Sequence, residues 1–173
     1  MRIFLSLLFS VISLFALSDE QLKTLQEVRD IAKTIPDKYG ETYENTISAI
    51  CLTESSAGKN IIGDFHKGVD ITKASLGVMQ VQVATARHVS KYRKNFAFIK
   101  FKTDAQIANM LLTDIKLSAR IAATYLVMLV NARPTYYNAV SGYNGGMNNW
   151  PYYKRVTRHM ALVKKLVKSG YLS

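Results

Sequence analysis

The chain has 173 residues, of which 49% are hydrophobic and 10% aromatic, which suits a single domain with a real core and excludes a disordered chain. Lys and Arg number 23 against 12 Asp and Glu, a formal net charge of +11, so the surface should attract polyanions such as nucleic acid, anionic lipid or acidic cell-wall polymer. No zinc-finger spacing, recognition-helix motif or RNA-binding aromatic motif is present, which argues against nucleic acid.

Residues 1–18, MRIFLSLLFSVISLFALS, are typical of a secretory signal peptide. Arg2 supplies a positive start, an apolar run broken only by serines follows, and Ala16-Leu17-Ser18 has the small-x-small pattern of a cleavage site. The run is short for a membrane span, and an uncleaved anchor is the alternative. No later segment is expected to cross a bilayer. We therefore predict a mature domain over 19–173, exported to the periplasm or cell envelope.

Helical patterns dominate the rest of the chain. Apolar residues recur at helical spacing from a cap at Ser18 or Asp19 until Pro36. Thr103-x-x-Gln106 is a capping box, and the apolar stretch 113–130 is typical of a central helix. Further helices are predicted over 41–56, 76–92 and 152–168, with a basic linker through 102 and a loop or small lobe with short strands over 57–74.

The single cysteine, Cys51, cannot form an internal disulfide. It either pairs between molecules or acts as a small buried hydrophobe, and its neighbours Ile50 and Leu52 favour the second alternative. The histidines at positions 66, 88 and 159 show no metal-ligand spacing, and His159 is interpreted as a solvated surface residue. No G-x-S-x-G elbow and no glycine-rich phosphate loop occurs. We expect no metal and no cofactor.

Glu54 lies on the apolar face of its predicted helix, where a charged side chain is not expected. Ile47, Ile50, Cys51 and Glu54 follow one another at three- and four-residue steps, so the carboxyl shares an apolar face that must pack inward. Partial burial and the helix C-terminus would both raise its pKa, and a carboxyl that keeps its proton near neutral pH can act as a general acid. The alternative is a half-exposed Glu at a helix end, paired with a lysine.

Three short motifs in order give this carboxyl a context. Thr53-Glu54-Ser55-Ser56 closes an apolar helix, Ser75-Leu76-Gly77-Val78-Met79-Gln80 follows a loop, and Gly142-Tyr143-Asn144-Gly145-Gly146 follows the central helix. In this order and spacing they resemble the soluble lytic transglycosylase catalytic domain, a lysozyme-like fold related to goose-type lysozymes. The resemblance covers roughly residues 40–160 and implies a mainly α (α+β, lysozyme-like) domain with a small irregular or short-strand lobe after the helix that carries Glu54.

The chain departs from the family pattern at three places. Val78 replaces a leucine, which is an apolar exchange, and Gly142 replaces the alanine before Tyr-Asn, which we expect to loosen that turn. Ser118 and Ala119 stand where the family has Asn-Ile on its central helix. This last difference concerns local packing more than the chemistry.

The resemblance implies a peptidoglycan lytic transglycosylase, a lyase that cuts between N-acetylmuramic acid and N-acetylglucosamine and leaves a 1,6-anhydro end. Glu54 would serve as general acid and then as base. A typical glycosidase needs a second carboxylate; Asp64 and Asp70 lie in the following loop, where solvated acids are usual, and the family needs neither. The implied substrate-binding residues are Ser75, Met79, Gln80, Tyr143 and Asn144, because phenol and amide side chains suit sugar rings.

Two other interpretations stay open from the sequence. A goose-type muramidase would use water as nucleophile, and a non-cleaving peptidoglycan-binding module of an envelope assembly would keep the groove without the reaction. In each case the expected partner is the peptidoglycan glycan strand. We expect a monomer with no nucleic-acid partner.

Overall fold

The computed structural model describes residues 17–63 and 70–173. Most of the predicted signal peptide, together with Asp64 and His66, lies outside the described residues, so the boundary at 18/19 stays a prediction. The elements in chain order are α1 (Asp19–Lys33), α2 (Glu44–Ser55), β1 (Ile62–Gly63), η1 (Ile71–Lys73), β2 (Ser75–Leu76), α3 (Val83–Tyr92), η2 (Lys94–Phe101), α4 (Asp104–Thr113), α5 (Ile115–Ala132), α6 (Tyr136–Tyr143) and α7 (Trp150–Lys168). The predicted mainly helical fold with a small strand lobe is confirmed.

Local capping chemistry fixes where several helices begin. The Ser18 hydroxyl accepts from the Gln21 backbone N–H and the Gln21 side chain accepts in return, and Thr103 and Gln106 repeat this capping box at α4. The Asp114 carboxylate accepts from the Leu117 N–H and starts α5 at residue 115, two residues later than the sequence pattern predicts.

Two predictions for residues 76–102 are wrong. The helix predicted from residue 76 begins only at Val83, because Gly77 and Gln80 adopt left-handed backbone angles, φ +73° and +49°, that break a helix. The predicted basic linker through residue 102 is instead the 3₁₀ helix η2. The aromatic and amide-rich stretch after α5 is also partly helical, since Thr135 caps α6 through the Asn138 N–H.

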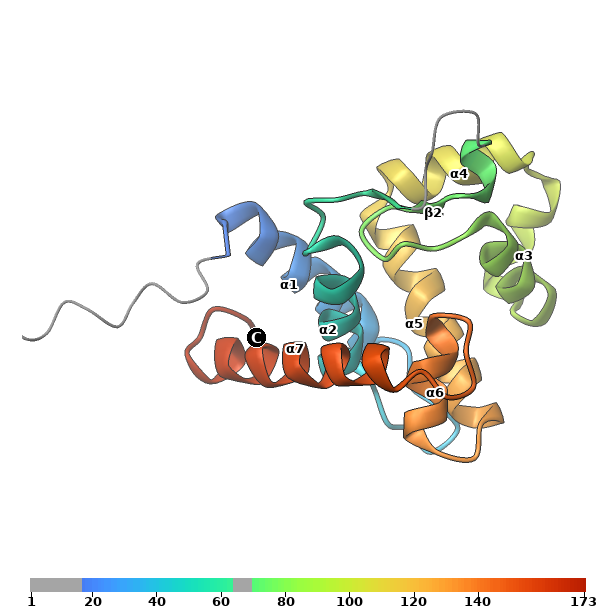
Figure 1. Cartoon of the computed structure of the whole chain (residues 1–173). Helices are drawn as coiled ribbons and strands as arrows, with labels where there is room; N and C mark the ends of the chain where they lie inside the picture. The colour runs from blue at the N-terminus through green and yellow to red at the C-terminus, as the bar shows by residue number, and fades with distance from the viewer. Residues whose placement is uncertain (1–16, 64–69) are drawn as a thin grey trace, which may run out of the picture.

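Helix α5 lies at the centre of the fold. It packs against α1 and α2 on one side and against α3, α4 and α6 on others, and α7 lies along α2 (Figure 1). In length and hydropathy α5 matches a membrane span, a property that was not expected of any segment after the signal peptide. Burial explains this apolar composition, because residues such as Ile121 and Leu126 are fully enclosed by neighbouring helices.

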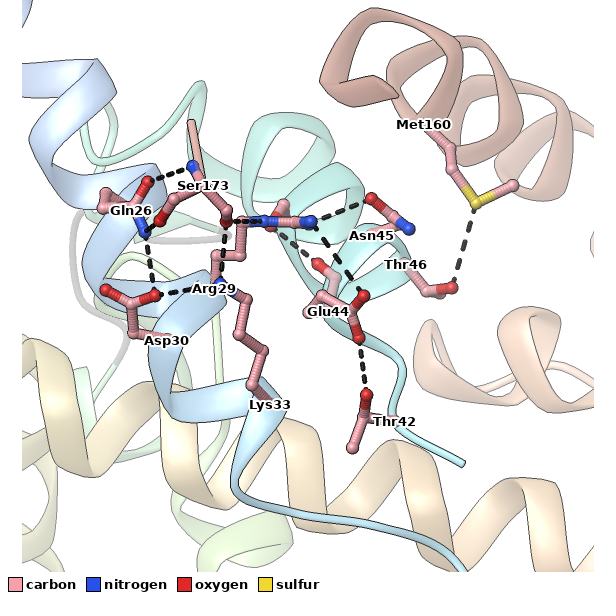
Figure 2. A network of polar contacts seen from close by, with 11 residues as sticks. Gln26, Arg29, Asp30, Lys33, Thr42, Glu44, Asn45, Thr46, Met160 and Ser173 are labelled. Atoms are coloured by element: carbon pink, nitrogen blue, oxygen red, sulfur yellow. Dashed lines mark hydrogen bonds and ion pairs between the residues drawn. The ribbon is translucent and has the colours of Figure 1, made fainter. Parts of the chain in front are cut away.

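A polar clamp ties the last residue to α1 and α2, as Figure 2 shows. The buried Arg29 donates from Nε to the Ser173 carbonyl at 2.6 Å and from Nη1 to the Asn45 side chain at 2.9 Å. Lys33 donates to the same carbonyl at 2.8 Å, and Gln26 accepts from the Ser173 N–H. The guanidinium is therefore paired and hydrogen-bonded, as a buried charge must be.

Cys51 provides a first test of the packing of α2. Its side chain is fully buried and burial raises the pKa of the thiol to about 12, which favours a buried hydrophobe over pairing between molecules. At pH 8 the thiol therefore stays protonated, whereas a free cysteine is partly ionised. We expect no reaction with a thiol-specific disulfide reagent at pH 8 until denaturant is added; stoichiometric reaction of the native protein would contradict the core position.

Candidate active site

The end of α2 presents Glu54 to a cavity and anchors the backbone behind it. Ser55 is fully buried, and its hydroxyl donates to the Val78 carbonyl at 2.7 Å while accepting from the Gly58 N–H at 2.8 Å. Ser56 and Ala57 then turn the chain with left-handed backbone angles, φ +52° and +56°. These contacts hold the helix end that carries Glu54 against the turn after β2.

The turn that follows β2 depends on glycines. A Cβ at Gly77 would lie 2.0 Å from the Leu111 carbonyl oxygen, and a Cβ at Gly63 would lie 2.1 Å from the Gln80 side-chain oxygen. Gln80 donates from Nε2 to the Gly77 carbonyl at 2.9 Å, and Leu76 and Val81 exchange backbone hydrogen bonds. The turn is thereby fixed with the Gln80 side chain at the cavity rather than in solvent.

Helix α6 brings the third motif to the same place. The Tyr143 hydroxyl donates to the Met79 carbonyl at 2.9 Å, which links the end of α6 to the turn after β2. Gly142 lies within α6, where a Cβ would approach Leu129 of α5 to 3.1 Å, so the glycine permits close packing of the two helices. The expected loosening of a turn at Gly142 is wrong, because the residue is helical.

The three motifs meet around one cavity of about 720 Å³. Glu54 is the sole acidic side chain among the residues known to line it in ranges 17–63 and 70–173. The lining consists of mixed hydroxyl, amide, phenol and small side chains: Glu54, Gly63, Ser75, Gln80, Val81, Gln82, Thr85, Ala122, Tyr125, Tyr143, Asn144 and Gly145. A wall of this chemistry suits a sugar, whose edges are polar and whose faces are apolar.

Five of the six residues predicted for the site line this cavity, and the sixth does not. Met79 is fully buried in the core, so its side chain lies behind the wall, and it reaches the site only through its carbonyl. Gln82, Thr85, Ala122 and Tyr125 line the cavity without having been predicted. Helical periodicity alone gives no signal for these four, since they lie at the start of α3 and on α5 and meet the three motifs only in the folded chain.

Tyr152 contacts Glu54, a pairing that was not predicted from the sequence. Its ring is 1% exposed, and its hydroxyl donates to Glu54 Oε1 at 2.6 Å. Burial, followed by the charge of Glu54 and this hydrogen bond, raises the pKa of Tyr152 far above its usual value. The phenol is therefore protonated at every working pH, and it fixes one carboxyl oxygen from the protein side while the carboxyl lines the cavity.

Removing the Tyr152 hydroxyl should move the pH dependence of the site. A donated hydrogen bond stabilises the carboxylate, so Tyr152→Phe raises the pKa of Glu54 and shifts the alkaline limb of any Glu54-dependent activity to higher pH. Loss of a hydrogen bond to a charged group, about 1.5–3 kcal/mol, also lowers the rate roughly ten- to hundredfold below that limb. The pH–rate profile measures both effects, and Tyr153→Phe is the matched control because its ring contacts Tyr136, Tyr137 and Trp150 instead.

Asp70, which was considered as a second catalytic carboxylate, does not line this cavity. Asp70 is exposed, caps η1 through the Thr72 N–H at 2.9 Å, and its pKa is lowered chiefly by that backbone hydrogen bond. Its role in the described structure is therefore a capping one. Among residues 17–63 and 70–173, no cluster of His, Cys, Asp and Glu side chains suitable for a metal ion occurs.

His159 is not the solvated residue that the sequence suggested. It is partly buried on α7, and its Nδ1 lies 2.8 Å from the Thr53 hydroxyl oxygen. Because that hydroxyl donates to the Ala49 carbonyl at 2.7 Å, the histidine must donate from Nδ1. Burial, followed by the charges of Arg158 and Arg155, lowers the pKa of His159, so a neutral imidazole ties α7 to the residue before Glu54.

Comparison with protein-family models gives a match to the transglycosylase SLT domain over residues 35–161. No curated protein and no solved structure matches the chain. The matched range contains α2 with Glu54, the turn after β2, and the end of α6, and so covers all the elements that form the cavity. The resemblance seen in the three motifs is thereby confirmed, and with it a peptidoglycan-directed activity of the lytic transglycosylase type at the level of the family. The chain belongs to the transglycosylase SLT domain family.

Proposed function

We propose that the protein is a peptidoglycan lytic transglycosylase that cleaves the β-1,4 bond between N-acetylmuramic acid and N-acetylglucosamine. The observation that carries this proposal is the sugar-sized cavity with Glu54 as the acid among its known lining residues. Family membership supplies the substrate class. A carboxyl that accepts a hydrogen bond from the Tyr152 hydroxyl and lines a polar cavity has the position that proton transfer to a bound sugar requires.

The proposed reaction has two proton transfers through one residue. Protonated Glu54 gives its proton to the glycosidic oxygen, the bond from that oxygen to C1 of the muramoyl residue breaks, and the N-acetylglucosamine hydroxyl leaves. The muramoyl C6 hydroxyl then attacks C1 and loses its proton to the Glu54 carboxylate. The products are a 1,6-anhydromuramoyl end and a free 4-hydroxyl, and Glu54 is again protonated. The N-acetyl carbonyl of the substrate assists at C1 as positive charge develops.

The remaining cavity residues have roles that their chemistry suggests. Tyr143 and Asn144 present a phenol and an amide at one wall, and Gln80 and Ser75 present an amide and a hydroxyl at another. Burial, followed by the charge of Glu54, raises the pKa of Tyr143 well above its usual value. Its hydroxyl therefore stays protonated and bound to the Met79 carbonyl, and the Tyr125 and Tyr143 rings, whose centroids lie 5.9 Å apart, would together contact the apolar face of a sugar.

We further propose that the chain is exported through the signal peptide predicted over 1–18 and acts as a monomer in the periplasm or cell envelope. The family's substrate lies outside the cytoplasm, which is consistent with export. N-terminal sequencing of protein recovered from the envelope fraction tests the predicted cleavage site: a mature chain that begins at Asp19 is expected, and a retained Met1 would favour an uncleaved anchor.

Release of soluble fragments tests the activity itself. Purified sacculi incubated with the protein should yield soluble muropeptides in proportion to time and enzyme concentration. Protein that binds sacculi in a sedimentation assay yet releases no fragments over the same period would instead identify a non-cleaving wall-binding module, and would overturn the proposed reaction. Heat-unfolded protein at the same concentration is the blank for both measurements.

A further inference from the structure

A strongly basic and aromatic segment lies outside the cavity and has no part in the proposed reaction. Residues 91–102 read KYRKNFAFIKFK, and no Asp or Glu occurs between Asp70 and Asp104. The segment joins the end of α3 to α4 and is mostly the 3₁₀ helix η2. We call residues 91–102 the basic aromatic segment.

The 3₁₀ geometry sorts these side chains onto three rows. A 3₁₀ helix has about three residues per turn, so side chains three apart lie above one another. Phe96 and Ile99 form a row that is buried in the core, 3% and 1% exposed. Phe98 and Phe101 form a second row that faces outward, 40% and 86% exposed. Lys94 and Lys100 form the third row, and both are exposed.

Three cations of this segment are not neutralised by acids among residues 17–63 and 70–173. In the described structure Arg93, Lys94 and Lys100 form no ion pair with an acidic side chain. Asp104, the next acid along the chain, is already engaged by Arg87, whose Nε donates to it at 2.7 Å. The field of the segment is therefore positive and directed to solvent.

A second cavity adjoins the same segment. It has a volume of about 730 Å³, and its lining includes Tyr92, Arg93 and Lys94 from this segment and Arg120 from α5. No Asp or Glu is among its known lining residues in the described part of the chain. Arg and Lys side chains around a polar hollow suit a phosphate group, which accepts hydrogen bonds from several donors.

Two adjacent phenylalanines that face water, beside a row of lysines, point to a specific kind of surface. A soluble polyanion needs only the cations and leaves the exposed rings without a partner. An anionic bilayer satisfies both, since its phosphates attract the cations and its acyl boundary accepts the aromatic rings. We propose that the basic aromatic segment docks this protein on anionic phospholipid, with η2 at headgroup level, Phe98 and Phe101 inserted, and lipid phosphate held at Arg93, Lys94 and Arg120.

Sedimentation with lipid vesicles tests the proposal directly. The protein should bind vesicles of phosphatidylcholine with phosphatidylglycerol and should bind vesicles of phosphatidylcholine alone much more weakly. The double variant Phe98→Ser/Phe101→Ser should bind the anionic vesicles at least about tenfold more weakly. Tyr39→Ser/Tyr171→Ser is the matched control, because these rings are 77% and 65% exposed elsewhere, and it should bind like the unaltered protein.

Two double lysine variants distinguish the local charge of the basic aromatic segment from the overall charge of the protein. Lys94→Gln/Lys100→Gln should weaken vesicle binding more than Lys164→Gln/Lys165→Gln, which removes the same charge from exposed positions on α7. Equal losses of vesicle binding in the two lysine variants would overturn the proposal, and so would full vesicle binding by the phenylalanine variant. The same affinity for inorganic polyphosphate as for vesicles in every variant would also overturn it. Circular dichroism confirms that each variant is folded, and because vesicle binding is measured without sacculi, its failure is distinct from failure of the proposed reaction.

Discussion

Glu54→Gln is expected to lower muropeptide release about 10²–10⁴-fold, the range that a general acid–base group contributes. Glutamine keeps the shape of the side chain, and its amide oxygen can still accept from the Tyr152 hydroxyl, so folding should be unchanged. What is lost is the proton that the leaving oxygen needs and the base that the attacking hydroxyl needs. Initial rates on purified sacculi, with equal amounts of folded protein, measure the effect.

Asp70→Asn is the matched control for this loss. It removes a carboxylate of the same lobe that is exposed and caps η1 rather than lining the cavity. Its rate should stay within a few-fold of the unaltered protein. Equal activity of Glu54→Gln and the unaltered protein would remove Glu54 from the mechanism, and a comparable loss in Asp70→Asn would point to a two-carboxylate mechanism instead.

Among the glycines that the structure describes, Gly77 should be the one at which substitution by alanine lowers the stability most. Gly77 has φ +73°, and an added Cβ would lie 2.0 Å from the Leu111 carbonyl oxygen, which is backbone and cannot move aside alone. The left-handed angle costs about 1 kcal/mol and the forced shift about 1–3 kcal/mol more. We expect a total of about 2–4 kcal/mol in the free energy of unfolding, measured by denaturant titration.

Gly40→Ala separates the cost of the left-handed backbone angle from the cost of the close contact. Gly40 has φ +87°, and an added Cβ there would meet nothing within 4 Å. This variant should lose only the conformational term of about 1 kcal/mol. If both variants lose the same free energy, the close approach to Leu111 does not constrain the turn. A larger loss for Gly77→Ala, together with lowered activity, ties the turn that carries Gln80 to the stability of the cavity wall.

The position of Glu54 could be predicted because its sequence neighbours carry the signal. Ile47, Ile50 and Cys51 share its helical face and are fully buried. The carboxyl at the end of that face is therefore partly buried and lines the cavity. Motif order then placed Tyr143, Asn144 and Gln80 at the same cavity. The capping box at Thr103, which acts within four residues, was likewise predicted from the sequence, and of the two caps predicted for the first helix, Ser18 or Asp19, the structure has Ser18.

What the sequence could not supply depends on contacts between distant segments. Tyr152 meets Glu54 across 98 positions, and nothing in the spacing separates it from Tyr153. Met79 belongs to a matching motif, yet its side chain packs in the core while its carbonyl makes the contact at the site. The wrong helix start at residue 76 has the same origin, because apolar residues there pack into a turn whose left-handed angles are set by neighbours.

The chemistry of the released end tests the central claim most directly. Sacculi digested in water enriched in oxygen-18 should yield 1,6-anhydromuramoyl products, each lighter by one water than the hydrolysis product and free of label, because the C6 hydroxyl rather than water attacks C1. Mass spectrometry separates the outcomes without reference to rate. Products that carry a reducing muramoyl end with one labelled oxygen would show hydrolysis, and would contradict attack by the C6 hydroxyl.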